Sequence, residues 1–164
     1  MGAAATALTS PSTSAASPSP SATFAVSGSV HLKVTSTICS VINRGGVRSV
    51  TISDRADPQI AVVVRAYQTG TVNLATTRKD LVSFGDSAGP TKIRIWLAGW
   101  SGALDPAEPS TGGSTVGSGT LVVQSKQVGA RGHLTVRMKA ASSKIEPGNK
   151  VTSTVSVSAS WNCG

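Results

Sequence analysis

The chain has 164 residues, which is enough for one domain with a substantial core. Only 13% of them are charged, against roughly 25% in average soluble chains, and small and hydroxyl residues fill the shortfall. The 15 basic and 7 acidic residues give a formal net charge of +8, which permits polyanionic partners without selecting one. No apolar run reaches the roughly 18 residues of a membrane span, so the sequence excludes a transmembrane helix.

Residues 1–23 are predicted to be a disordered leader. Residues 9–23 consist of Ser, Thr, Ala and Pro, which cannot bury apolar area and should form an extended tether. The first eight residues, MGAAATAL, resemble the small-residue tail of an export signal, although an ordinary flexible terminus would look similar. We therefore expect a secreted or tethered protein with a single β-rich domain over residues 24–164.

Alternating apolar and polar residues follow from Phe24 onward, a pattern typical of half-buried antiparallel strands. The first such run places Val30, Leu32, Val34 and Ile38 on one face. A single helical turn is conceivable at 78–81, and 99–119 is the longest irregular stretch. The expected strands cover residues 30–38, 47–52, 60–67, 72–74, 92–97, 120–128, 134–140 and 151–161. About eight or nine short strands predict an all-β fold, either an antiparallel sandwich or an open barrel.

Two cysteines occupy positions near opposite ends of the predicted domain. Cys39 ends the first strong strand pattern and Cys163 is the penultimate residue. A bridge between them would clasp both ends of the domain and stabilise it by roughly 4–5 kcal/mol in the chain-entropy model. Such a bridge suits an oxidising compartment. The alternative is a pair of unrelated buried thiols.

Residues for catalysis or metal binding are sparse. The two histidines, His31 and His133, lie on the polar sides of predicted strands. Residues 99–103, GWSGA, lack the last glycine of a nucleophile elbow, and the acidic residues lie in turn-like sequence. No metal-ligand spacing and no glycine-rich nucleotide motif is present. We therefore expect, as the first function, a non-enzymatic secreted or envelope-tethered domain that binds or displays, without metal or cofactor and with a ligand that the sequence does not identify.

The candidate ligand-binding residues are Trp96, Trp100, Lys92 and Arg94. A regular strand places Trp96 on the face of Lys92 and Arg94, away from the aliphatic residues of the same strand. An exposed tryptophan there could stack on a sugar or anchor a lipid, as in a carbohydrate-binding module. The competing interpretation is a strand buried on both faces, or a cation–π contact over the long loop.

The basic residues suggest a third function, the binding of anionic lipid or another polyanion. Lys92, Arg94, Arg137 and Lys139 are the candidate cations. The charges are spread singly and the chain has three Trp, two Phe and one Tyr with no RNA-binding aromatic motif, which disfavours nucleic acid. Envelope polysaccharides or lipids are the better candidates in an exported protein.

Three segments carry a resemblance to a known family: Val26–Val30 after the leader, Gly132–Val136, and Val155–Cys163 at the end. They resemble small actinobacterial exported lipoproteins, in particular the 19-kilodalton lipoprotein antigen family of mycobacteria. This resemblance implies a lipid-anchored display domain without catalytic residues. The chain departs from the family in lacking a lipobox cysteine. The Ser/Pro/Thr leader and terminal cysteine are also similar to cellulose-binding modules, but the tryptophan spacing is not.

Overall fold

The structure is a computed structural model that describes residues 20–44, 47–67, 69–87, 93–103, 112–124, 131–141 and 152–164. The predicted all-β fold is confirmed. The elements are β1 (Ser21–Gly28), β2 (Leu32–Val34), β3 (Thr37–Arg44), β4 (Val47–Asp54), β5 (Ala61–Ala66), β6 (Gly70–Asn73), β7 (Leu81–Ser87), β8 (Ile93–Trp100), the short 3-10 helix η1 (Ser101–Ala103), β9 (Thr115–Val116), β10 (Ser118–Val123), β11 (Arg131–Ala140) and β12 (Thr154–Asn162). The described part of the chain contains no helix with the length and apolar character of a membrane span.

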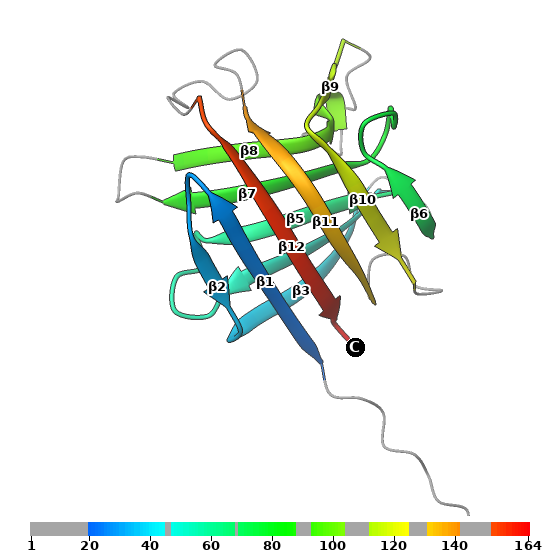
Figure 1. The fold of residues 1–164 in the computed structure, drawn as a ribbon. Coiled ribbons are helices and arrows are strands. Elements are labelled where there is room, and N and C mark those ends of the chain that lie inside the picture. Colours follow the sequence, from blue (N-terminus) through cyan, green and yellow to red (C-terminus); the bar gives the residue numbers. More distant parts are fainter. Residues whose placement is uncertain are drawn as a thin grey trace, which may run out of the picture.

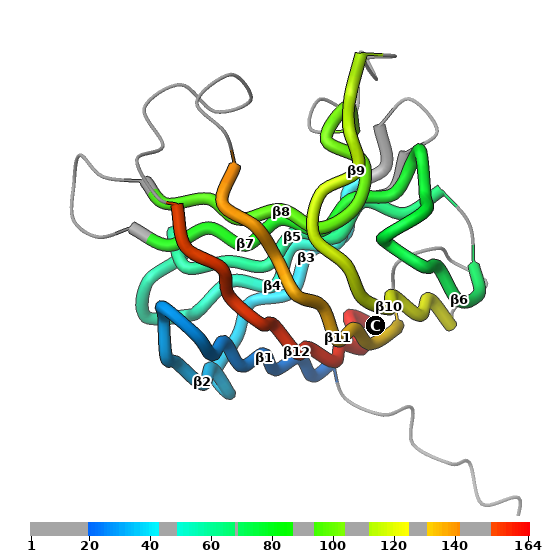
Figure 2. Tube along the Cα trace, turned by 45° about the horizontal axis from the view of Figure 1, so that its top comes forward, coloured from blue at the N-terminus to red at the C-terminus, as the bar shows by residue number. Residues whose placement is uncertain are grey.

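The strands form two antiparallel layers that are joined at one corner. The front sheet has the order β2-β1-β12-β11-β10-β6, and the back sheet has β3-β4-β5-β7-β8 with β9 beside β8. Front strands cross over back strands in Figure 1, and Figure 2 shows the same layers from a direction turned by 45°. The end of β11 pairs with β8 through Lys139 with Leu97 and Ala140 with Trp96. One continuous sheet therefore wraps into a nearly closed barrel.

Alternate residues of the strands fill the space between the layers. On β11 and β12 the register pairs Leu134 with Ala159 and Val136 with Val157, and all four are buried. An aromatic cluster occupies the centre of this core, with ring centroids 6.4 Å apart for Phe24 and Phe84 and 5.5 Å apart for Phe84 and Trp96. Full burial of an aliphatic or aromatic side chain contributes roughly 1.5–3 kcal/mol each, so this alternation is the main source of stability.

The prediction of one continuous strand over residues 30–38 is wrong. Instead of one strand over 30–38, the chain breaks at Thr35 and Ser36 and passes from the front sheet to the back sheet. Val34 is consequently buried, whereas Ile38 points outward and is exposed. In addition, β1 begins at Ser21, so the last residues assigned to the leader belong to the first strand. The remainder of the predicted leader, residues 1–19, lies outside the described residues.

Strand β7 was not predicted from the sequence, and the suggested helical turn at 78–81 is wrong. Residues 78 and 79 form a bend, and β7 begins at Leu81. The bend is held by the buried Asp80, whose carboxylate accepts hydrogen bonds from the Tyr67 amide at 3.1 Å and the Thr77 hydroxyl at 2.6 Å. These side-chain bonds favour a turn over a helix.

The second corner of the barrel is a seam between β1 and β3. No strand pairing joins the described residues there, and β2 and β3 are the two ends of the sheet path. The seam is held by the Thr37 hydroxyl, which donates to the Ala22 carbonyl at 2.8 Å, and by a disulfide between Cys39 and Cys163. The predicted disulfide is thus confirmed, with Cα atoms 5.5 Å apart.

Both ends of the described domain meet beside this disulfide. A Cβ atom on Gly164 would lie 3.7 Å from Cγ of Pro20, the residue before β1. Strands β1 and β12 are also neighbours over their full lengths, from the pair Ser21 with Asn162 to the pair Gly28 with Val155. The chain ends therefore leave the domain from one place.

Candidate functional site

Trp96, the leading predicted contact residue, lies in the core. Its side chain is fully buried, stacks on Phe84, and donates a hydrogen bond from indole Nε1 to the Ser153 carbonyl at 3.1 Å. The exposed-tryptophan prediction is therefore wrong, and the interpretation of a strand buried on both faces holds. The reason is the position of β8 at the joined corner, where the neighbouring Leu97 is buried on the opposite face.

Arg94 and Trp100 do not join Trp96 in a surface site. Arg94 forms a salt bridge with Asp86, and its guanidinium lies 5.7 Å from the centre of the Trp96 ring. Trp100 packs against a second, smaller apolar cluster, because Gly99 adopts φ +108° and reverses the alternation of β8. The fourth predicted residue, Lys92, lies outside the described residues.

The outward-pointing residues of β2, β1, β12 and β11 form a second candidate, which we call the outer face. Alternation in these strands directs the large apolar residues inward and leaves short hydroxyl side chains outside. Rows run across the strands through the ladder pairs Ala25–Ser158–Thr135 and Thr23–Ser160–His133. The outer face comprises Thr23, Ala25, Ser27, Lys33, Arg131, His133, Thr135, Arg137, Lys139, Thr154, Ser156, Ser158 and Ser160.

A shallow groove of about 350 Å³ crosses the outer face. Its floor is formed by short side chains of the two central strands, including Ala25, Ser158 and Ser160. Longer side chains on the flanking strands, Lys33 on β2 and His133 on β11, form its sides. The groove therefore results from side-chain size, because small residues lie on the two central strands and larger residues lie on the flanking strands. Hydroxyl groups line it with both donors and acceptors.

Acidic side chains are confined to one of the two sheets within the described residues, whereas cations occur on both. The outer face carries the exposed cations Lys33, Arg131, Arg137 and Lys139, and none of them has an acidic partner among the described residues. The acidic side chains of the described residues all belong to the back sheet and its turns: Asp54, Asp57, Asp80 and Asp86. No acidic side chain of the described residues therefore neutralises the cations of the outer face, and these cations attract anions.

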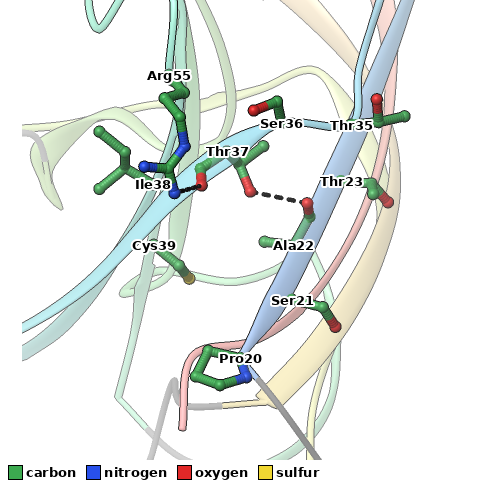
Figure 3. Close-up of a pocket in the computed structure, with 10 residues that line it drawn as sticks. All are labelled: Pro20, Ser21, Ala22, Thr23, Thr35, Ser36, Thr37, Ile38, Cys39 and Arg55. Atoms are coloured by element: carbon green, nitrogen blue, oxygen red, sulfur yellow. Dashed lines mark hydrogen bonds between the residues drawn. The ribbon is translucent and has the colours of Figure 1, made fainter.

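A second hollow, of about 490 Å³, lies at the seam between β1 and β3 (Figure 3). The hydroxyl side chains around it come from both walls, and Arg55 lies at one side. Thr37 Oγ1 donates to the Ala22 carbonyl across the hollow, and Arg55 Nη2 donates to the Thr37 carbonyl at 3.2 Å within the β3 wall. This arrangement explains the closure of the barrel better than it explains recognition of a ligand.

Only Arg137 and Lys139 of the outer face were singled out from the sequence. Lys33, Arg131 and His133 were missed, because the order of strands that brings them together cannot be obtained from local pattern. The only available sequence signal was the serine at every second position of β12. It identifies the solvent-facing side of this strand but not the strands that lie beside it. Among the described residues no group of three or more His, Cys, Asp or Glu side chains could hold a metal ion.

Comparisons of the chain with protein-family models, with curated proteins and with solved structures found no match.

Proposed function

We propose that the protein is a non-catalytic extracellular binding domain, secreted or held at the cell envelope by its Ser/Thr/Ala/Pro-rich leader, and that its outer face binds an anionic polysaccharide. The observation that carries this proposal is the hydroxyl-lined groove with Lys33 at one side, on a face that also carries Arg131, Arg137 and Lys139 and has no acidic side chain among the described residues. The disulfide supports the extracellular part, because such bonds persist in oxidising compartments. The resemblance to exported lipoproteins agrees with it.

The spacing of the cations suits a chain-like anion. Side chains on one face of a strand repeat every two residues, about 6.8 Å, so Arg137 and Lys139 are close enough to act on adjacent anionic groups. Lys33 lines the groove itself, and the two central strands separate it from β11, which carries Arg137 and Lys139 beyond the groove. Exposed ion pairs contribute only about 0.2–1 kcal/mol each, so several contacts along a polymer are needed for useful affinity.

Hydroxyl groups favour a sugar polymer over nucleic acid or a membrane. Ser158, Ser160 and Thr135 can donate to and accept from sugar hydroxyls along the groove. The outer face as defined contains no Phe, Tyr or Trp side chain on which bases could stack. Nor does it present a large apolar side chain for insertion into a bilayer, because the exposed large hydrophobic residues of the described chain lie on β3.

The test compares two double variants that remove equal charge. Arg137→Ser/Lys139→Ser changes the outer face, whereas Arg78→Ser/Lys79→Ser changes an exposed bend between β6 and β7 that is not part of the outer face. Binding of the oxidised protein to heparin, a sulfated polysaccharide, is measured by calorimetry, with dextran as the neutral control. We expect the outer-face variant to bind about tenfold more weakly and the control variant to bind nearly as well as the unmodified protein.

A second pair of variants separates the groove from the surrounding charge. Ser158→Glu puts a carboxylate on the groove floor and should abolish heparin binding, while Ala75→Glu, at an exposed turn, should have little effect. Equal losses in both members of either pair would mean that total charge, and not the outer face, drives binding. Saturable binding to anionic vesicles or single-stranded DNA but not to heparin would refute the polysaccharide.

A further inference from the structure

Strand β11 carries a row of exposed side chains along the outer face. Exposed and buried residues alternate strictly from one end of this strand to Lys139. The exposed members, which we call the β11 row, are Arg131, His133, Thr135, Arg137 and Lys139. Successive members lie about 6.8 Å apart, so the row extends over roughly 27 Å. Its arginines and lysine are cations at neutral pH, whereas a histidine gains its charge in mildly acid solution.

Short hydroxyl side chains lie beside the β11 row on both neighbouring strands. The ladder with β12 places exposed serines opposite the three middle positions of the row: Ser160, Ser158 and Ser156. On the other side, β10 presents the exposed residues Ser118 and Thr120. Strands β11 and β12 run side by side across the front of the barrel (Figure 1). A polymer that lies on the serines of β12 can therefore contact the longer side chains of β11 along its length.

His133 is the member of the row that lines the groove. From the strands on either side, Ser160 of β12 and Val122 of β10 lie opposite it. The charged groups nearest to it among the described residues are Arg131 on its own strand and Lys33 across the groove. No acidic side chain of the described residues lies on this face. The positive charge of a protonated His133 is therefore not neutralised by these residues and is available to a bound anion.

We propose that an anionic polysaccharide lies lengthwise along β11 and β12, and that protonation of His133 strengthens its binding. This inference rests on the proposed function, to which it adds the direction of the polymer and a response to pH. Arg131 and Arg137 are separated by about 20 Å along the strand, and Thr135 adds no charge between them. Protonated His133 puts a cation into this gap, so the polymer meets positive charge along most of the row.

A polyanion distinguishes the two protonation states of His133. Histidine side chains bind a proton as the pH falls through roughly 6.5. The protonated form attracts the polymer and the neutral form does not, so affinity should rise as the pH falls through this range and decrease again above it. The carboxylates and sulfates of heparin stay ionised there, so the charge of the polymer itself does not change.

The test measures heparin binding to the oxidised full chain by calorimetry at about pH 5.5 and about pH 7.5. The unmodified chain should bind about threefold more tightly in the acid buffer, as one added ion pair allows. His133→Gln should bind in both buffers as weakly as the unmodified chain at neutral pH. His133→Lys should bind in both as tightly as the unmodified chain in acid. His31→Gln, at an exposed position before β2, is the matched control and should keep the threefold response.

The direction of the polymer is tested with single variants at the two ends of the row. Arg131→Ser and Lys139→Ser should each weaken binding about threefold, because a lengthwise polymer contacts both ends. A polymer that crosses the strands can contact only one of them, so a loss at one end alone would overturn this direction. Arg78→Ser, at the exposed bend between β6 and β7, is the control for the loss of one charge.

The outcomes separate this inference from the proposed function. Heparin binding with the same pH response in the unmodified chain and in His133→Gln would overturn the inference and leave the proposed function standing. A response that is lost in His31→Gln would do the same, because the other histidine would then be responsible. Absence of heparin binding in both buffers would overturn both. Thermal unfolding of each variant verifies that it is folded, which is expected because the altered side chains are exposed.

Discussion

Removal of the disulfide, in the variant Cys39→Ala/Cys163→Ala, should destabilise the domain severely. The bond closes a loop with a sequence separation of 124 residues, for which the chain-entropy model gives about 5 kcal/mol. Little else replaces it at the seam, where the described strands are not paired and the Thr37–Ala22 hydrogen bond contributes only about 1 kcal/mol. For a domain of this size, about 3 °C per kcal/mol gives a fall in Tm of about 15 °C.

Urea unfolding followed by tryptophan fluorescence measures this loss with and without a thiol reductant. The oxidised protein should unfold at the highest urea concentration, and reductant should lower its midpoint to that of the variant. The variant's own midpoint should be the same in both conditions, because it has no bond to reduce. Equal midpoints for the oxidised protein and the variant would refute the reasoning, as would a reductant effect on the variant.

Three further perturbations act on other parts of the core. Trp96→Ala should cost about 3–5 kcal/mol in urea unfolding, because it removes a buried ring stacked on Phe84; a loss below about 1 kcal/mol would contradict its burial. Asp80→Ala should lower the free energy of unfolding by about 1–3 kcal/mol. It should also speed hydrogen exchange of the Tyr67 amide, which loses its acceptor. Burial and, secondly, the charge of Asp80 raise the pKa of Tyr67 above 10.0, so stability should fall as pH rises past that value. Tyr67→Phe should make this decline shallower in thermal unfolding between about pH 9 and 12, and an unchanged slope would exclude the effect.

The strands that could be predicted from the sequence are those with one solvent-exposed face and one buried face. In β12 the alternation of Val155 and Val157 with serines identifies both the strand and its buried face. In β7 only Val82 and Phe84 form an apolar period of two, because the next inward position is the buried Asp86 and Leu81 is buried as well, so the pattern is too short to reveal the strand. The exposure of Trp96 on β8 was mispredicted because both faces of this strand are covered. The presence of Arg94 on the same face suggested solvent exposure, but Trp96 is buried.

The disulfide was predictable and the groove was not, because they depend on different kinds of information. Cys39 and Cys163 are the only two cysteines, so one pairing was available. The groove requires that β2, β1, β12 and β11 lie side by side, which joins residues from near the start of the chain to residues near its end. Local pattern shows that Lys33 and His133 face solvent, but long-range pairing decides that they share a hollow.

The meeting of Pro20 and Gly164 at one corner makes the domain suitable as an insert. A host protein could carry it within a loop, with both connections only a few ångströms apart and the disulfide resisting fraying of the junction. For the same reason a short linker between these two residues would allow circular permutation with the break placed elsewhere. Because Thr23 lines the groove just three residues from that corner, a module fused at either end would stand beside the groove and restrict the ligands that reach it.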